Sequence, residues 1–389
     1  MMDTSDKIKD VITKNLKRTD SESVSAAANA RSSALHGYKK QVDELLMLTA
    51  QKGASDLHLS PGYYPTIRVD WRLIPLADHK ILDKQLLDNL VLSLLEDGPK
   101  EKFLAEKELD FAYEIGEKLR FRVNIYQTRG NFAAAFRLIP EEVKTIEELN
   151  LPPVVKMFTK LSQGFVLVVG PNGHGKSTTM AAMIDSINHE RAEKIVTIED
   201  PIEYIFNPDK SIIDQRSVYF DTISFNKALR STFRENVNVI MVGEMRDYDT
   251  ISTAVTAAET GHLVFASLHT NNAAQSIERI IDVFPPEQQR QIVSQLASTI
   301  SGVISMRLIP RVKGGLIPAA EVMIANTAVR NLIREGRVQQ LNLAIDTGSD
   351  AGMISLNRSL ADLVKRGEIS YEQAEFYSLN PEELRDLLK

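Results

Sequence analysis

The residue pattern with the clearest chemical meaning is Gly170-Pro171-Asn172-Gly173-His174-Gly175-Lys176-Ser177, which fits G-x-x-x-x-G-K-[ST]. It follows the apolar run 165–169 and precedes a helix-compatible run over 177–187, the strand, loop and helix order of a phosphate-binding loop. Glycines let backbone N–H groups turn inward around phosphate oxygens, and the helix N-terminus adds its dipole. Lys176 would place a cation on the β- and γ-phosphates, and Ser177 would offer its hydroxyl to Mg²⁺. A glycine-rich turn with an incidental Lys-Ser pair is the alternative, but the full spacing favours nucleotide binding.

Acidic residues follow two further apolar runs. Glu244 comes just after the run 239–242, where a phosphate-loop fold presents a carboxylate to the water shell of the metal. A second acidic cluster, Thr197-Ile-Glu-Asp-Pro-Ile-Glu203, also follows an apolar run. Carboxylates beside a polyphosphate repel it unless a metal or a water proton intervenes, which suggests activation of a nucleophilic water. The alternatives are a solvated acid at Glu244 and a capping acid before a turn at Pro201.

Two histidines, His262 and His269, flank a third apolar run. Either could donate to a γ-phosphate or bond to the acidic cluster. A single histidine at a strand end is more often structural, but a pair that brackets a core strand favours function. Metal ligation is less favoured, since neither cysteine nor a further histidine lies at ligand spacing.

The composition narrows the class of protein. The 389 residues include 46 basic and 52 acidic side chains, and the net charge of -6 argues against a protein that coats nucleic acid. Short basic clusters such as 307–313 do not change that balance. The chain has no cysteine, so it can form neither disulfides nor a cysteine-ligated zinc site, which suits a reducing cytoplasm. The apolar run 165–169 is too short to cross a bilayer, and residues 1–20 carry scattered charges where a signal peptide is apolar. We therefore expect no direct membrane insertion.

Changes in composition and periodicity suggest how the chain is divided. We expect a leader over 1–37, an α+β domain over 38–140, a linker over 141–153, an α/β core over 154–325 and a helical region over 326–389. The leader contains no aromatic side chain, so disorder or weak helix is expected. Its alternative is a docking helix with one apolar face, formed by Ile8, Val11, Ile12 and Leu16.

Two kinds of strand are expected. In the first domain, alternating residues predict strands over 56–59, 66–69, 109–115, 119–126 and 132–139, with helices over 82–95 and 100–106. In the core, continuous apolar runs predict buried parallel strands over 165–169, 194–198, 239–242 and 262–268. The fold class is therefore α/β.

Five segments in this order make the sequence similar to a known family. They are Ala54-Ser-Asp-Leu-His-Leu-Ser60, the phosphate-binding loop, the acidic cluster 197–203, Val242-Gly-Glu-Met-Arg-Asp247, and the region from Gly261-His-Leu-Val to His269-Thr-Asn271. From about Gly53 to its C-terminus, the chain resembles the secretion ATPases of type II and type IV systems and type IV pili. Within that family it is most similar to the ATPases that retract type IV pili. The segment 328–335 resembles a motif that those ATPases need for retraction but not for ATP hydrolysis.

The resemblance implies a hexameric ring in which a PAS-like N-terminal domain and a RecA-like core hold ATP and Mg²⁺ between them. It implies that Glu203 is the general base, that Glu244 is the Walker B acid that meets Mg²⁺ through water, and that Ser177 also meets the metal. The two histidines match the residues of the family's His box, and Arg122 matches an N-domain arginine that acts in catalysis on domain closure. The implied nucleotide contacts are Gly170, Pro171, Asn172, Gly173, His174, Gly175, Lys176, Ser177, Thr178, Arg129 and Arg137.

The function that this resemblance implies is pilus retraction and twitching motility, in the cytoplasm and peripheral to the inner membrane. A platform protein of the pilus machinery would be the partner, with a related ATPase as a further candidate. Extension and secretion ATPases often carry a four-cysteine zinc loop, which this chain cannot form. Accessory retraction ATPases usually lack the motif at 328–335. A nucleic-acid translocase and an inactive nucleotide-binding scaffold are the alternatives from other classes.

Two loop residues and one segment depart from the family pattern, and the leader has no counterpart in the compact retraction ATPases. Asn172 and His174 stand where the family usually has Thr and Ser, and Glu235-Asn-Val-Asn238 replaces an acidic segment. The first two are variable positions of the loop, so binding should survive them. The third leads us to expect slower turnover.

Overall fold

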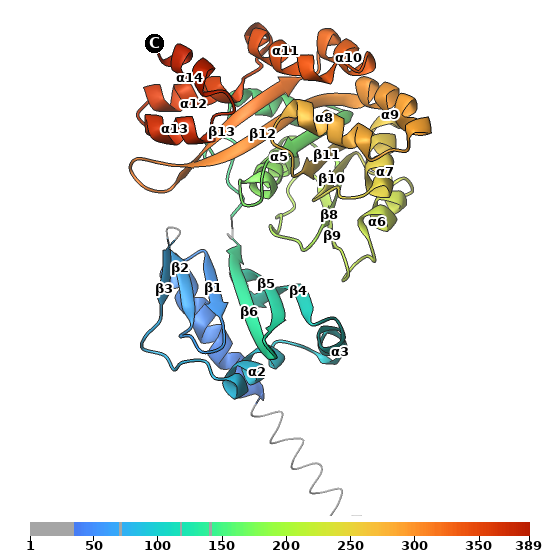
Figure 1. Cartoon of the computed structure of the whole chain (residues 1–389). Helices are drawn as coiled ribbons and strands as arrows, with labels where there is room; N and C mark the ends of the chain where they lie inside the picture. Colours follow the sequence, from blue (N-terminus) through green and yellow to red (C-terminus); the bar gives the residue numbers. More distant parts are fainter. Residues whose placement is uncertain (1–34, 70–71, 117–118, 140–141) are drawn as a thin grey trace, which may run out of the picture. The chain divides into compact units, whose positions relative to one another are not determined.

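The computed structural model describes residues 35–69, 72–116, 119–139 and 142–389 (Figure 1). The contacts divide the chain into two units, Met1–Ile139 and Pro140–Lys389. The leader expected over 1–37 lies outside the described residues up to position 34. Positions 35–37 belong to a helix over 35–51.

The first unit is built on one antiparallel sheet in the order β3-β2-β1-β6-β5-β4. Its strands are β1 (Asp56–Leu59), β2 (Thr66–Val69), β3 (Arg72–Pro75), β4 (Glu108–Ile115), β5 (Leu119–Thr128) and β6 (Asn131–Ile139), and its helices include α2 (Lys84–Leu92) and α3 (Asp97–Glu106). The five strands and two helices predicted from the sequence are confirmed. β3 was missed because all four of its residues are exposed, so it has no apolar alternation.

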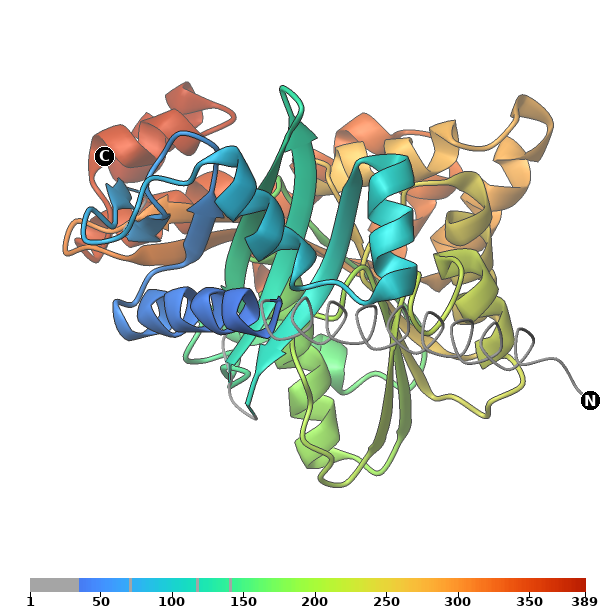
Figure 2. The same ribbon diagram turned by 90° about the horizontal axis from the view of Figure 1, so that it is seen from below.

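One face of this sheet is apolar and the other is polar. On β5 the buried residues are Phe121, Val123 and Ile125, and they pack in one core with residues of the helix over 35–51, α2 and α3. Figure 2 shows these helices on one face of the sheet. Because side chains alternate along a strand, Arg122 points to the opposite face.

The second unit contains a seven-stranded sheet in the order β13-β12-β7-β11-β10-β8-β9. All neighbouring pairs are parallel except β12 with β13, which form an antiparallel hairpin. The strands are β7 (Gly164–Val169), β8 (Lys194–Glu199), β9 (Ile212–Ser217), β10 (Val239–Val242), β11 (Leu263–Leu268), β12 (Ile300–Pro310) and β13 (Leu316–Ile324). The four predicted parallel strands are confirmed. β9, β12 and β13 were not predicted, and β9 in particular is an edge strand of mixed polarity.

Helices cover both faces of this sheet, which explains its continuous apolar strands. Phe165, Leu167 and Val169 of β7 pack toward α6 (Phe225–Thr232), α7 (Tyr248–Glu259), α8 (Ala273–Asp282), α9 (Pro286–Thr299), α10 (Thr327–Arg334) and α11 (Leu341–Thr347). Val166 and Val168 pack toward α4 (Lys156–Thr159) and α5 (Lys176–Glu190). The α/β fold class predicted from the sequence is therefore confirmed.

The C-terminal part of the chain packs on the β12–β13 hairpin. α12 (Leu356–Lys365), α13 (Tyr371–Tyr377) and α14 (Pro381–Leu388) share a small core with Ile309, Ile317 and Ala319, and Figure 1 shows them beside β13. Across the described parts of the chain, none of the helices combines the length and the apolar character needed to span a bilayer.

Candidate functional site

The predicted phosphate-binding loop connects the C-terminal end of β7 to the first residue of α5. Gly170, Gly173 and Gly175 adopt positive φ angles of 146°, 77° and 87°. At Gly170 a Cβ atom would lie 2.6 Å from the carbonyl oxygen of Met306, so glycine is required there by the close approach of β12 as well as by conformation. The loop thus has the shape that the sequence pattern predicts.

Lys176 lies inside this loop. Its ammonium group donates to the carbonyl oxygens of Gly170 at 2.9 Å and Pro171 at 3.0 Å, and lies 3.1 Å from Nδ1 of His269. Burial lowers the pKa of Lys176, and the negative charges of Glu244 and Glu203 counteract this effect. The cation, the histidine and both predicted acids therefore belong to one electrostatic site.

Glu244 lies on the other side of the same imidazole. Its Oε1 accepts from Nε2 of His269 at 2.7 Å, and Arg246 donates to both of its oxygens, at 2.6 and 2.7 Å. Burial alone would raise the pKa of Glu244, but the hydrogen bonds from Arg246 and His269 and the charge of Arg246 hold it below its ordinary value. Glu244 is therefore an ionised carboxylate at neutral pH.

The second acidic cluster surrounds a buried carboxyl group, Glu199, at the end of β8. Glu199 accepts from the hydroxyl of Thr197 at 2.6 Å and from the backbone N–H of Glu203 at 3.4 Å. Burial raises the pKa of Glu199 to about 7. The side chain of Glu203 is half-buried, and its charge acts on Lys176. Of the two acids, Glu203 is the one whose charge acts on the pKa of Lys176.

The four segments that form this site lie together because they all follow or end parallel strands of one sheet. Gly170 follows β7, Glu244 follows β10, His269 follows β11 and Glu199 ends β8. Parallel strands end at the same edge, and ligands of open α/β sheets bind there. The pairing of Val169 with Leu268 and of Val242 with Ala266 brings these ends together.

His262 lies at the opposite edge. It precedes β11, its Nδ1 donates to the carbonyl oxygen of Ala257 at 2.9 Å, and its ring packs edge to face on Phe233. With the six residues of β11 between them, the two histidines are separated by about 23 Å at ~3.3 Å per residue step. The structure thus brings His269 to the phosphate-binding loop of the chain and places His262 away from it, where its contacts are those of a packing residue.

Strand β12 packs against the phosphate-binding loop and the start of α5, and residues of both hydrogen-bond to it. His174 accepts a hydrogen bond through Nδ1 from the backbone N–H of Leu308 at 2.9 Å, and Thr179 donates its hydroxyl to the sulfur of Met306 at 2.9 Å. The His174 ring also lies edge-on to Tyr377 of α13, at 6.4 Å between centroids. Burial, with the charges of Arg307 and Lys176, lowers the pKa of His174, so its Nδ1 is free to accept at neutral pH.

The other predicted nucleotide contacts in the second unit are Asn172 in the loop and Ser177 and Thr178 in the first turn of α5. Asn172 is exposed, and Ser177 is half-buried in the first turn of α5. The Thr178 hydroxyl lies 2.9 Å from the hydroxyl of Tyr204, which joins α5 to the acidic cluster.

The three predicted arginines all belong to the first unit. Arg122 on β5 and Arg137 on β6 are paired residues, and Arg137 donates through Nε to Asp56 at 3.0 Å. Arg129 adopts a φ of 50° in the turn between those strands. The approach of these three side chains to phosphates stays a prediction.

Several residues at the site were not predicted. Arg307, treated in the sequence as part of a basic cluster, is buried and donates to Asn271 at both the backbone and the side-chain oxygen, each at 3.0 Å. It thereby holds the segment that follows His269. Arg246 is the bidentate partner of Glu244. No local pattern distinguishes Arg307 from its exposed neighbours, although the segment 242–247 did contain Arg246.

The residues present fit a magnesium ion that is bound together with a nucleotide. Mg²⁺ is usually held by one or two protein oxygens plus phosphates and water, rather than by a cage made only of protein. Ser177 and Glu244 provide such oxygens, and within the described residues there is no group of three or more His, Asp or Glu that could hold a metal alone. When bound, the ion would neutralise phosphate charge.

This fold and site define a class of protein. The family described as "Type II/IV secretion system protein" matches residues 36–334, which is more than half of the chain. The chain belongs to this family.

Within this family, the chain is similar to proteins named for pilus retraction and twitching motility. The chain is 45% identical over 345 residues to the "Type IV pilus retractation ATPase PilT" of Pseudomonas aeruginosa, covering 88% of this chain and 99% of that protein. It is 43% identical to a "Twitching motility protein" of Neisseria gonorrhoeae, covering 82% and 86%. A crystal structure of "the Pilus Retraction Motor PilT and Bound ADP" matches with a TM-score of 0.81 and 42% identity, over 89% of this chain and 99% of that one. The resemblance to retraction ATPases predicted from the motifs is confirmed.

Proposed function

We propose that this protein is an ATP-hydrolysing motor that drives the retraction of type IV pili. The observation that carries the proposal is the contact series from Lys176 through His269 to Glu244, which joins a phosphate-binding cation to a metal-binding acid. The same chain is similar over nearly its whole length to retraction ATPases. Sequence similarity supports the retraction role, and the geometry supports the chemistry.

In this proposal the loop 170–177 wraps the phosphates with backbone N–H groups, and Lys176 neutralises the charge between the β- and γ-phosphates. To do so its ammonium group must exchange the carbonyl oxygens of Gly170 and Pro171 for phosphate oxygens. A cation already placed in the loop loses little conformational freedom on binding.

In the proposed reaction, Glu244 and Glu203 have different roles. Glu244, which is held ionised, orients the water shell of Mg²⁺, while Glu203 takes the proton of the attacking water. His269 donates to Glu244 through Nε2, so it fixes the carboxylate that faces the metal. Arg122, Arg129 and Arg137 are proposed to reach the phosphates from a PAS-like first unit.

The working assembly in this proposal is a homohexamer beside the inner membrane. It would reach the membrane through a platform protein of the pilus machinery, since none of the described helices could span a bilayer. A related ATPase is a further candidate partner, as 35% identity to the "Type IV pilus ATPase PilU" of Pseudomonas aeruginosa supports.

The test combines an enzyme assay with genetics. The purified protein should hydrolyse ATP in the presence of Mg²⁺, and Lys176→Ala should abolish turnover. A strain that lacks the gene should carry excess pili and fail to twitch, and the wild-type gene but not Lys176→Ala should restore motility. Absent pili in the deletion strain would indicate an extension motor instead, and undiminished hydrolysis by Lys176→Ala would contradict the assigned site.

A further inference from the structure

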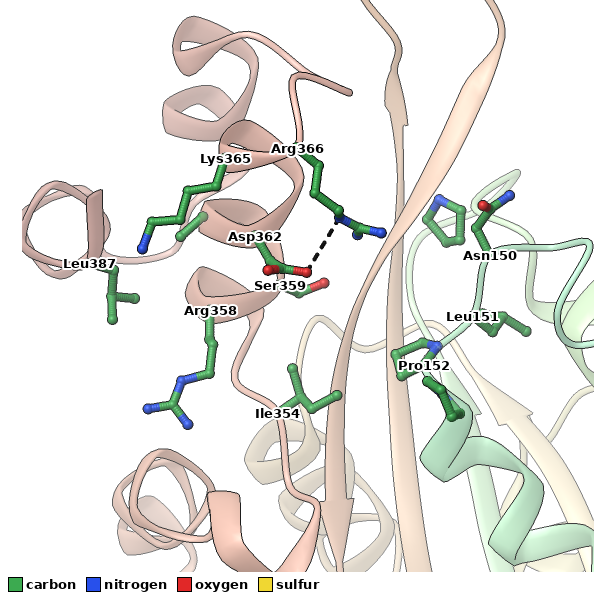
Figure 3. A pocket seen from close by; sticks show the side chains of 13 residues that line it. Asn150, Leu151, Pro152, Ile354, Arg358, Ser359, Asp362, Lys365, Arg366 and Leu387 are labelled. Atoms are coloured by element: carbon green, nitrogen blue, oxygen red, sulfur yellow. Dashed lines mark ion pairs between the residues drawn. The ribbon is translucent and has the colours of Figure 1, made fainter. Parts of the chain in front are cut away.

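A cavity of about 460 Å³ lies beside α12 in the second unit (Figure 3). Its lining comes from the segment 150–153, β13, α12, the residue Ile354 and α14, and it includes no residue of the phosphate-binding loop. Leu151, Pro152 and Leu387 are among its apolar lining residues. The segment 150–153 lies in the second unit, which begins at Pro140.

The charged side chains of the cavity all come from α12 and the residue that follows it. They are Arg358, Asp362, Lys365 and Arg366. Arg366 pairs with Asp362 at 3.4 Å, as the dashed line in Figure 3 marks. Within the part of the chain that the structure describes, Arg358 and Lys365 have no hydrogen-bond or ion-pair partner. Two cations are therefore left uncompensated at the cavity.

The packing of α12 fixes which face of the helix carries Arg358 and Lys365. Leu356, Leu360 and Leu363 are buried in the C-terminal core. Positions 358, 362 and 365 are spaced by four and three residues, so they share the opposite face of the helix. Figure 3 shows Arg358 and Lys365 extending on the side of Leu387, while Arg366 extends toward Asn150. Arg358, Lys365 and Arg366 are exposed to solvent, so a ligand at the cavity could reach them without any change in the packing of α12.

We propose that this cavity binds a small organic anion that carries a phosphate group, at a site separate from the nucleotide loop. The volume lies in the range of small-molecule sites, about 300–1,000 Å³, and apolar walls with a few polar groups are typical of them. A guanidinium group binds phosphate oxygens in a bidentate manner, and an ammonium group adds a point charge. The cavity lining carries three cations and one carboxylate, a local excess of positive charge in a chain whose net charge is -6.

An acidic peptide is the competing occupant. It is less favoured because α12, α14, β13 and the segment 150–153 bound the cavity on several sides, which suits a compact ligand better than an extended chain. The experiment below includes both.

The test uses the full-length protein saturated with ADP and Mg²⁺, so that the nucleotide loop is filled. The probe is 1-naphthyl phosphate, whose fluorescence reports binding, with neutral 1-naphthol as its uncharged counterpart. We expect saturable binding of the phosphate that is at least tenfold tighter than binding of 1-naphthol. Arg358→Glu with Lys365→Glu should weaken it at least tenfold while the ATPase rate stays within twofold.

Lys227→Glu, on the exposed side of α6, is the matched control and should change binding less than twofold. Four results would overturn the proposal: no saturation at millimolar probe, equal affinity for 1-naphthol, equal loss in the control variant, and no loss in the double variant. Tighter binding of a hexaglutamate peptide that the double variant abolishes would overturn it in favour of a protein-docking surface. Unchanged melting temperature and ATPase rate in both variants would show that each remains folded.

Discussion

His269 bonds to Glu244 through Nε2 at 2.7 Å while its Nδ1 lies 3.1 Å from the ammonium group of Lys176. Because an ammonium group has only protons to offer, Nδ1 is the acceptor and the ring proton sits on Nε2, where it is donated to the carboxylate. One imidazole thus connects Lys176, the cation proposed to bind phosphate, to Glu244, the acid proposed to meet the metal through water.

The first prediction concerns this imidazole. We expect His269→Ala to lower kcat about tenfold to a hundredfold, since one charge-assisted hydrogen bond contributes about 1.5–3 kcal/mol. ATP affinity should change much less, because the loop backbone and Lys176 remain. Steady-state kinetics and nucleotide titration separate the two effects. His189→Ala on α5 is the control, and an unchanged kcat in His269→Ala would contradict the assigned role.

The two acids should differ in kinetics. Glu203→Gln should bind ATP normally and lose turnover, because the amide has nearly the same shape but cannot take a proton from water. Glu244→Gln should chiefly raise the Mg²⁺ concentration needed for half-maximal rate, since it removes a charge beside the metal. If the larger fall in kcat at saturating Mg²⁺ appears in Glu244→Gln, the two roles are reversed. Loss of nucleotide binding in both variants would mark them as structural.

His174 allows a sharper test because asparagine can copy one of its atoms. In His174→Asn the amide oxygen takes the place of Nδ1 and can accept from Leu308, whereas His174→Ala leaves that backbone N–H without its bond. We expect His174→Ala to raise the KM for ATP about fivefold to tenfold, for a neutral hydrogen bond of about 1 kcal/mol, and His174→Asn to restore most of it. Equal effects in the two variants would show that the ring contact with Tyr377, rather than the bond to β12, positions the loop.

Glu199 predicts a dependence of stability on pH. Its pKa is about 7 in the folded protein against 4.5 for an ordinary glutamate, so between these values the folded state holds a proton that the unfolded state releases. The free energy of unfolding should therefore fall as pH rises from 4.5 to 7, by at most about 3 kcal/mol from this group.

Glu199→Gln cannot ionise, so its stability relative to the wild type should increase between pH 5 and pH 8. Urea unfolding at the two pH values measures this difference. Glu190→Gln, at an exposed position of α5, should show no such trend. A difference between wild type and Glu199→Gln that does not vary with pH would refute the assignment. Glu321, whose pKa burial also raises to about 7, contributes in the same direction and is present in both proteins.

The last prediction separates two arginines of α10, in the segment that resembles the retraction motif. Arg330 donates to the carbonyl oxygens of Ala325, Ala297 and Ser298, and so anchors α10 to the end of α9. Arg334 is exposed and bonds to Asn331 of its own helix. Arg330→Ala should therefore destabilise the protein by about 1.5–3 kcal/mol, while Arg334→Ala should change stability by less than about 0.5 kcal/mol.

If the segment couples the motor to the pilus, Arg334→Ala should keep its ATPase rate and lose retraction in cells. Thermal melting, ATPase assays and twitching assays measure the three properties. Normal twitching in Arg334→Ala would count against a coupling role for the exposed face of α10. An unchanged melting temperature in Arg330→Ala would show that its backbone bonds contribute nothing.

The sequence by itself determined the parts of this protein whose chemistry is local. A run of eight residues specifies the phosphate-binding loop, because its glycines, lysine and hydroxyl act within one turn of chain. The four buried parallel strands were predicted because helices on both faces require continuous apolar residues. Glu244 was identified because it stands just after the end of such a strand, whereas Glu203 was singled out within its acidic cluster by the family resemblance.

Only the tertiary structure decided which distant residues meet. His262 and His269 look equivalent in sequence, but β11 separates them, so only His269 reaches the loop. Arg307 resembles the less buried Arg311 and Lys313 of the same basic cluster and is nevertheless buried, because its strand β12 is covered on both sides. Arg330 hydrogen-bonds to the end of α9 because α9 and α10, which are separate in the sequence, pack together in the structure. In each case the deciding quantity is burial or contact between segments far apart in the chain, and local residue patterns do not encode it.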